Sequence, residues 1–113
     1  MGKEESVFFN HILDAISYVE SYTKDVSINE FMFNHLIQDG VIRQLEIIGE
    51  AVKSISDETR SQYSDIPWQD MAGMRDILIH QYFGVDLDEV WTTVQMDIPK
   101  VKMMIQKIID GMK

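Results

Sequence analysis

Residues 74–82 hold the side chains best suited to chemistry in this sequence. Arg75 is separated from His80 by four residues, and Tyr82 stands two positions further on. Histidine suits proton transfer because its ordinary pKa, about 6.5, lies near neutrality. Arginine supplies a permanent charge and paired donors for phosphate oxygens. Such residues suit the transesterification of RNA, in which a 2′-hydroxyl attacks the adjacent phosphate while one group takes its proton and another protonates the leaving oxygen.

These three side chains do not share one face of a straight helix. At about 100° per residue, Arg75 and Tyr82 lie about 20° apart around the axis, whereas Arg75 and His80 lie about 140° apart. Either the helix ends near His80 and its side chain turns back, or a second subunit completes the site. Spacing alone leaves both alternatives open. It also fits the common case in which an arginine and a histidine on a helix only form ion pairs or caps.

The elements that must position this stretch are typical of helices joined by short turns. Apolar residues recur at steps of three and four over residues 4–24, which indicates an amphipathic helix. Ser27 followed by Glu30 predicts a capped helix start. The helical pattern then runs to about residue 55, and residues 34–35 are the place where it could break.

Gly40 and Gly49 lie inside this second helical pattern. Each marks either a weakened helix or a close approach of another element, and Gly49 suits close helix packing or a dimer interface. Residues 56–67 are polar and end in a proline, which predicts a loop before the next helix. That helix should cover about residues 68–82, with Gly84 as its stop signal.

The C-terminal part predicts one more helical region. Asp86 and Glu89 form a second capping pair, and Pro99 predicts a kink or break near residues 97–98. No segment indicates a strand. The sequence therefore predicts an all-α protein, a bundle of about four or five helices formed by residues 1–113 as a single domain.

Composition excludes several classes of protein. Hydrophobic residues make up 45% of the 113 residues, so the chain should fold around a modest core. It has no cysteine, and His11 and His35 lack the spacing of metal ligands, so we expect no bound metal or other cofactor. No apolar run approaches the roughly 20 residues of a spanning helix, and no signal peptide is visible. We therefore expect a cytoplasmic protein without membrane contact.

The net charge of −9 opposes simple RNA binding, because affinity for phosphates comes largely from lysine and arginine. Four lysines and one aspartate lie in the last fourteen residues, so this segment carries +3 and residues 1–99 carry −12. Contact with RNA would need a local patch formed by Arg75, the C-terminal lysines and, if present, a second subunit. The acidic remainder is a solvated surface or suits a basic partner protein.

A second charged pattern lies upstream of the arginine and histidine. Glu46 and Glu50 are four positions apart, and Arg43 and Lys53 each lie three positions from one of them. This spacing favours surface ion pairs along one helix. The alternative is a set of carboxylates that supports the site or binds a partner.

Several motifs resemble, in order, those of one known family. The string Arg75-x-x-x-x-His80-x-Tyr82 resembles the motif of HepT-like toxins of the HEPN superfamily. Residues 43–51 resemble the family's "IGEA" helix, residues 66–75 resemble the approach to its motif, and residues 85–99 resemble its C-terminal portion. The resemblance covers about residues 10–110.

The resemblance implies a helical bundle that forms a homodimer, in which two arginine–histidine motifs meet in a composite cleft. It implies that Arg75 and His80 are catalytic residues of a metal-independent ribonuclease. It also implies a partner, a nucleotidyltransferase antitoxin of the MntA type, that silences the toxin by transferring AMP to Tyr82. The added bulk and negative charge would block an RNA phosphate from the cleft.

Two positions depart from the family's pattern. Asp76 follows the motif arginine, where asparagine is common, and Gln81 occupies a position where a smaller residue is common. A carboxylate at Asp76 could pair with Arg75 or orient a histidine in a supporting role, but it would also repel RNA locally.

Two alternatives to a ribonuclease stay open. The chain could be a catalytically silent helical module that docks a nucleotidyltransferase, which its acidic charge favours. It could instead present a substrate to that nucleotidyltransferase, but this alternative has no use for Arg75 and His80.

Overall fold

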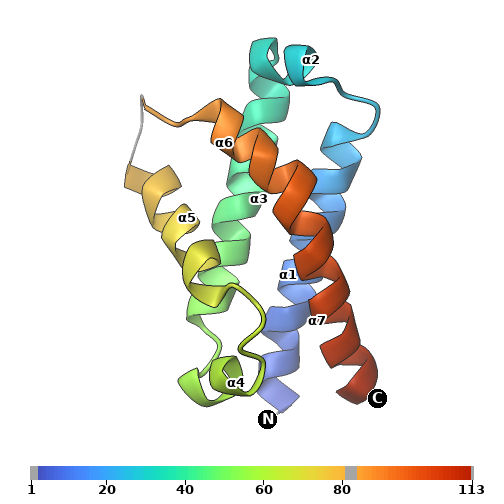
Figure 1. Ribbon diagram of the computed structural model, residues 1–113, viewed down its shortest axis with the longest axis vertical. Coiled ribbons are helices and arrows are strands. Elements are labelled where there is room, and N and C mark those ends of the chain that lie inside the picture. The colour runs from blue at the N-terminus through green and yellow to red at the C-terminus, as the bar shows by residue number, and fades with distance from the viewer. Residues whose placement is uncertain (1–2, 81–83, 113) are drawn as a thin grey trace.

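The computed structural model describes residues 3–80 and 84–112, and the regular elements that these residues form are all helical (Figure 1). The elements are α1 (Lys3–Thr23), α2 (Ile28–Phe33), α3 (His35–Lys53), α4 (Asp57–Gln62), α5 (Trp68–His80), α6 (Leu87–Thr92), the π-helical segment η1 (Thr93–Asp97) and α7 (Ile98–Met112). Four of them, α1, α3, α5 and α7, are long, and α2, α4 and α6 are short helices of six residues each. The described residues contain no strand, so the predicted all-α bundle is confirmed.

Helix α3 is the centre of the bundle. It packs along α1 on one side and along α5 on the other, and α7 packs against α1 (Figure 1). The short α2 and α4 lie at opposite ends of the long helices. Because α5 contacts the rest of the protein mainly through α3, the position of any side chain on α5 depends on that one interface.

The core follows the predicted apolar stripe of the first helix. Ile12, Ile16 and Val19 are fully buried. Phe9 is also fully buried, whereas its neighbour Phe8 is half-buried. Along the part of the chain that the structure describes, no helix combines the length and apolar character needed to cross a membrane.

Three predicted helix boundaries are confirmed by their capping side chains. The Ser27 hydroxyl accepts a hydrogen bond from the Glu30 amide, and the Asp86 carboxylate accepts one from the Glu89 amide. Asn34 ends α2 and caps α3 by accepting a bond from the Ile37 amide, so the break allowed at residues 34–35 is present.

The predicted loop over residues 56–67 is wrong in part, because it contains α4. Ser56 caps this short helix by accepting a bond from the Thr59 amide. The Glu5 carboxylate of α1 accepts bonds from the Ser56 amide and the Thr59 hydroxyl. These bonds hold the pKa of Glu5 below its ordinary value, with the Thr59 hydroxyl as the first cause. A contact with a residue more than fifty positions away therefore stabilises a helix that its own polar sequence does not predict.

Pro99 changes the helix in the predicted place without ending it. Its ring nitrogen cannot donate to the carbonyl four residues earlier, and its ring crowds that carbonyl. The chain responds with the wider turns of η1, which connect α6 to α7 directly.

Gly49 allows α3 and α5 to come close enough to touch. A Cβ added at Gly49 would lie 2.2 Å from the Cβ of Arg75 and 2.9 Å from the carbonyl oxygen of Met71. Non-bonded carbon atoms prefer separations of about 3.5–4.0 Å, so no other residue fits without moving α5. The predicted close approach at Gly49 is confirmed, and the neighbouring element is α5 of the same chain.

Replacing Gly49 with alanine should therefore push α5 away from α3. We expect Gly49→Ala to lower the free energy of unfolding by about 1–3 kcal/mol or more, as overpacking does. Gly73→Ala is the matched control, because a Cβ at Gly73 on α5 would meet nothing within 4 Å. The control should be neutral or stabilising by up to about 1 kcal/mol, since alanine favours helix. Equal effects of the two substitutions in urea unfolding would contradict the close contact.

Candidate active site

Arg75 is held against α3 by two carboxylates. Its Nη2 lies 2.9 Å from Glu50 Oε2 on α3, and its Nη1 lies 2.9 Å from Asp76 Oδ1 on its own helix. Its side chain is 23% exposed, so part of the guanidinium can be reached from solvent. Its Nε is buried and has no hydrogen-bond partner among the described residues. Asp76, then Glu50, raise the pKa of Arg75 above its ordinary value against the effect of burial, which keeps the charge permanent.

Asp76 links Arg75 to a second cation. Lys53 Nζ of α3 lies 2.5 Å from the same Oδ1 atom of Asp76 that Arg75 contacts. The Lys53 ammonium first, and the Arg75 guanidinium second, hold the pKa of the Asp76 carboxyl below its ordinary value. Two cations and two anions, Lys53, Arg75, Glu50 and Asp76, thus form one ion-pair network, here called the Arg75 network.

His80 is fixed by the backbone of the same aspartate. It is the last residue of α5 that the structure describes, and its Nδ1 lies 2.8 Å from the Asp76 carbonyl oxygen. A carbonyl oxygen can only accept, so Nδ1 carries a proton. In the neutral ring Nε2 is therefore left as a base, and in the protonated ring it is an acid. Since the side chain is exposed, Nε2 can exchange protons with a ligand.

Asp76 thus contacts both candidate catalytic residues, through its carboxylate to Arg75 and through its carbonyl to His80. The pairing of Asp76 with Arg75, expected from the sequence as one alternative, is present. The histidine side chain contacts the preceding turn of its own helix, and the structure does not decide between the two geometric alternatives that the spacing leaves open. Among the bonds that the described residues form, none joins Arg75 to His80 directly, and Asp76 is their shared neighbour. Tyr82 lies outside the described residues.

The charged residues of α3 do not all pair as their spacing predicts. Arg43 and Glu46 form the expected pair, at 3.8 Å between Nη1 and Oε1. Glu50 instead pairs with Arg75, and Lys53 with Asp76. Two of the predicted surface residues of α3 therefore reach across to the candidate site on α5. Lys53 was missed as a site residue, although its place on the Glu50 face of α3 was a usable signal.

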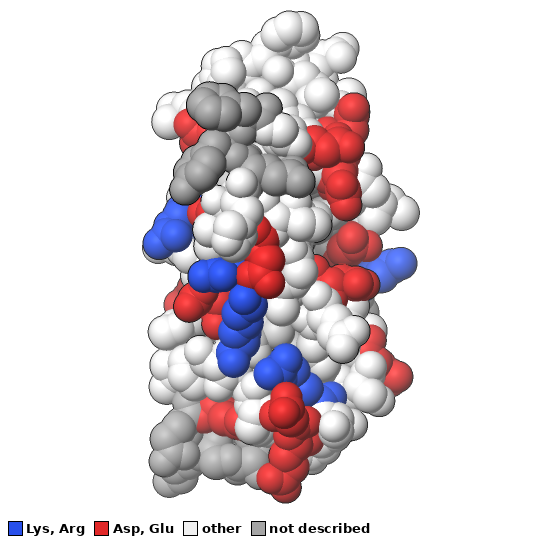
Figure 2. All heavy atoms as spheres, turned by 90° about the vertical axis from the view of Figure 1, so that its left-hand side faces the viewer, with Lys and Arg blue, Asp and Glu red and all other residues white. Residues whose placement is uncertain are grey.

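The predicted basic patch of Arg75 with the C-terminal lysines is not formed within one chain. Helix α7 runs along α1 rather than along α5, and Lys102 contacts Glu20 of α1 at 2.9 Å (Figure 1). On the face that Figure 2 shows, basic side chains are interspersed with acidic ones. The cations near Arg75 come from α3 instead, namely Lys53 and Arg43.

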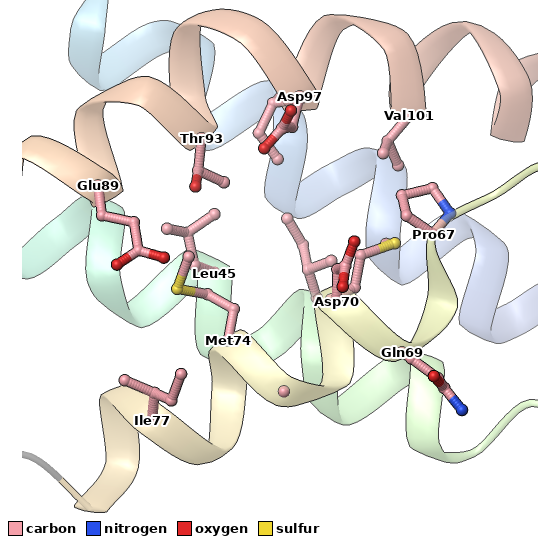
Figure 3. Close-up of a pocket in the computed structure, with 14 residues that line it drawn as sticks. Leu45, Pro67, Gln69, Asp70, Met74, Ile77, Glu89, Thr93, Asp97 and Val101 are labelled. Atoms are coloured by element: carbon pink, nitrogen blue, oxygen red, sulfur yellow. The ribbon is translucent and has the colours of Figure 1, made fainter.

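Another face of α5 borders a cavity that is lined mostly by apolar side chains but also by three carboxylates. This cavity, of about 460 Å³, lies between α5 and the region from α6 to α7 (Figure 3). Asp70 of α5 points into it from one side, and Glu89 and Asp97 point into it from the other. Among the described residues that line it there is no lysine or arginine. Like charges exclude a phosphate there, so the Arg75 side of α5 is the better candidate for an anionic substrate.

Proteins similar to this chain carry ribonuclease names. Residues 12–108 match the family described as "Ribonuclease HepT-like". A Methanocaldococcus jannaschii protein named "Gamma-glutamylcyclotransferase and putative RNase" is 49% identical over 110 residues, which are 97% of this chain and 50% of that protein. The chain therefore spans about half the length of that relative.

Two other relatives are covered almost completely. A second M. jannaschii protein, named "Putative RNase", is 47% identical over 105 residues, 90% of each chain. A Thermococcus cleftensis protein named "Probable ribonuclease HepT" is 41% identical over 108 residues, 96% of this chain and 98% of that one. No solved structure matches the sequence.

The Arg75 network predicts how the pKa of Asp76 responds to substitution. Lys53→Met should raise the Asp76 pKa toward its ordinary value of 3.8, because the first cause of its lowering is removed. Carbon-detected NMR titration of the carboxyl group measures this. Lys102→Met, which removes a cation paired with Glu20, is the control and should leave the Asp76 pKa unchanged.

The same network makes the stability of the protein depend on pH. Because the Asp76 pKa is lower folded than unfolded, its pairing stabilises the protein above the ordinary aspartate pKa. That stabilisation is lost as the pH falls through the lowered value. Wild type should therefore lose more stability on acidification than Lys53→Met, and equal losses would contradict the network.

Proposed function

Because the chain belongs to the HepT-like ribonuclease family, we propose that it is a toxin that cleaves RNA internally without a metal ion. Arg75 and His80 are the catalytic residues, and Asp76 positions both. The observation that carries this proposal is the bond between His80 Nδ1 and the Asp76 carbonyl, since it leaves Nε2 as the atom that exchanges a proton. The same aspartate restrains the guanidinium of Arg75 through its carboxylate.

The reaction needs one proton taken and one returned. Nε2 of a neutral His80 removes the proton from a ribose 2′-hydroxyl, and the 2′-oxygen attacks the adjacent phosphorus. The bond from phosphorus to the 5′-oxygen breaks, and a protonated imidazole gives its Nε2 proton to that oxygen. Arg75 stabilises the negative charge on the phosphorane through its terminal nitrogens. The products are a 2′,3′-cyclic phosphate and a 5′-hydroxyl.

Two imidazoles serve this scheme better than one, and a homodimer supplies them. His80 of one protomer acts as the base while His80 of the partner subunit acts as the acid. A composite cleft also doubles the number of arginines near the substrate, which matters for an acidic protein.

Regulation of the toxin is proposed to act on Tyr82. A nucleotidyltransferase antitoxin of the MntA type would transfer AMP to its hydroxyl. Tyr82 follows His80 by two positions, so the added phosphodiester would lie close to the catalytic histidine. Its negative charge and bulk would then exclude the RNA phosphate.

One observation favours a second candidate, a catalytically silent module that docks the nucleotidyltransferase. The charge of Arg75 is already balanced by Glu50 and Asp76, so a phosphate must compete with two carboxylates. The net charge of −9 adds to this competition.

Cleavage of RNA in EDTA distinguishes the two candidates. Unmodified wild type, with its intact mass checked for added AMP, should cleave a mixture of RNAs that includes tRNA. His80→Ala should lower the rate by about 10²–10⁴-fold, as loss of a general acid–base group does. Arg75→Ala should lower it by about 10²–10³-fold, as loss of one charge-stabilising group does.

His35→Ala is the control, because His35 is also an exposed histidine but lies at the start of α3. It should cleave at the wild-type rate. No cleavage by unmodified wild type would overturn the ribonuclease proposal in favour of the docking module. Equal cleavage by His80→Ala would overturn the catalytic role of His80.

Silencing through Tyr82 has its own test. Incubation with the nucleotidyltransferase and ATP should add AMP to wild type and abolish cleavage. Tyr82→Phe, which lacks the acceptor hydroxyl, should gain no mass and remain active. Tyr18→Phe removes the hydroxyl of a half-exposed tyrosine on α1 and should still be silenced. Silencing of Tyr82→Phe with added mass would place the modification elsewhere.

A further inference from the structure

A second hollow opens beside Arg75, on a different face of α5 from the acidic cavity. Its volume is about 350 Å³, within the range of small-ligand pockets. Helix α1 lines it with Phe8 and His11, α3 with Arg43 and Glu46, and α5 with Arg75. We call this hollow the Phe8–Arg75 pocket. A ligand in it would lie next to the guanidinium that holds the scissile phosphate in the proposed function.

One wall of the Phe8–Arg75 pocket is aromatic. The rings of Phe8 and His11 meet edge to face, with centroids 6.2 Å apart and planes at 83°. Phe8 is half-buried and packs against the core, which fixes the pair, whereas His11 is exposed to the pocket. Proteins bind unpaired RNA bases by stacking them on such aromatic side chains and on arginine.

Helix α3 contributes to this pocket a carboxylate, Glu46, that forms no hydrogen bond through its side chain within the described part of the chain. The Glu46 side chain is 18% exposed, and its cationic partner among residues 3–80 and 84–112 is Arg43, at 3.8 Å, too long for a hydrogen bond. Glu50, the next carboxylate along α3, is already occupied by Arg75. A carboxylate near an RNA phosphate repels it, so Glu46 favours RNA binding only if it meets donors on a base.

The pocket therefore combines a stacking surface, a carboxylate acceptor and an arginine. We propose that it is a nucleobase subsite that prefers guanine in the nucleotide next to the cleaved phosphate. Guanine presents two adjacent donors, N1–H and the N2 amino group, that match the two oxygens of a carboxylate. Adenine, cytosine and uracil present a donor flanked by an acceptor on the same edge. This inference rests on the proposed function for the position of the phosphate but not for the binding of the base.

Binding of mononucleotides tests the subsite without cleavage. Amide NMR titration of the full chain with GMP, AMP, CMP and UMP should give the tightest binding with GMP and shifts at Phe8, His11 and Glu46. Glu46→Gln should remove most of the preference for GMP. His11→Leu should weaken every nucleotide by roughly tenfold, and His11→Phe should restore binding because it can still stack a base.

Two further variants show whether a loss of binding comes from the pocket or from unfolding of the protein. His35→Leu is the matched control for His11→Leu and should bind as wild type does. Phe8→Leu keeps an apolar side chain against the core, so it should melt near wild type while binding bases weakly. Equal affinity for the four nucleotides, or affinity unchanged in both His11→Leu and Glu46→Gln, would overturn the subsite.

Cleavage separates a failure of the subsite from a failure of the proposed function. With oligonucleotides that differ in one base beside the cleaved bond, His11→Leu and Glu46→Gln should raise KM for the guanine substrate and change kcat little. If the cleavage rates of wild type and both variants do not depend on this base, the subsite proposal is overturned and the ribonuclease proposal stands. If GMP binds but no RNA is cleaved, base binding in the pocket stands and the ribonuclease proposal is overturned.

Discussion

At Gly49 the backbone of α3 lies directly against the side chain of Arg75, with no room for a Cβ between them. This close approach brings Glu50 and Lys53 of α3 within reach of Arg75 and Asp76 on α5. A wider separation of the two helices would break both cross-helix ion pairs and leave Arg75 and Asp76 paired only with each other. The electrostatics of the candidate site thus depend on a single missing side chain in the neighbouring helix.

The carboxylates of the Arg75 network orient the guanidinium of Arg75 but also occupy its hydrogen-bond donors. Glu50 and Asp76 fix the guanidinium before any substrate arrives, which lowers the cost of orienting it. The same carboxylates compete with a phosphate for its donors. Lys53 eases this competition because it shares Asp76, and its ammonium is the first cause of the lowered pKa of that carboxyl. In the proposed function, an acidic protein would in this way present a cation to RNA at one place, with a base contacted by the Phe8–His11 pair and by the Glu46 carboxylate.

Local signals in the sequence predicted most of the fold. The capping residues Ser27 and Asp86, the stripe of the first helix and the interruption before Pro99 all depend on neighbours within a few positions, and all are present. Helix α4 could not be predicted in this way, because Glu5, far away in the chain, holds its first turn. The partners of Glu50 and Lys53 were missed for the same reason: helical spacing predicts contacts along one helix, whereas the packing at Gly49 offers closer partners on another.

Mixing wild type with His80→Ala tests whether the His80 residues of two protomers act in one cleft. Wild-type and His80→Ala chains would be unfolded together in measured proportions, refolded and assayed for cleavage of RNA in EDTA. A mixed dimer holds one intact His80, so it lacks either the base or the acid, and the rate per wild-type chain should fall in proportion to the wild-type fraction. A rate per wild-type chain that stays constant, at concentrations where mixed dimers are seen by native mass spectrometry, would contradict a shared cleft.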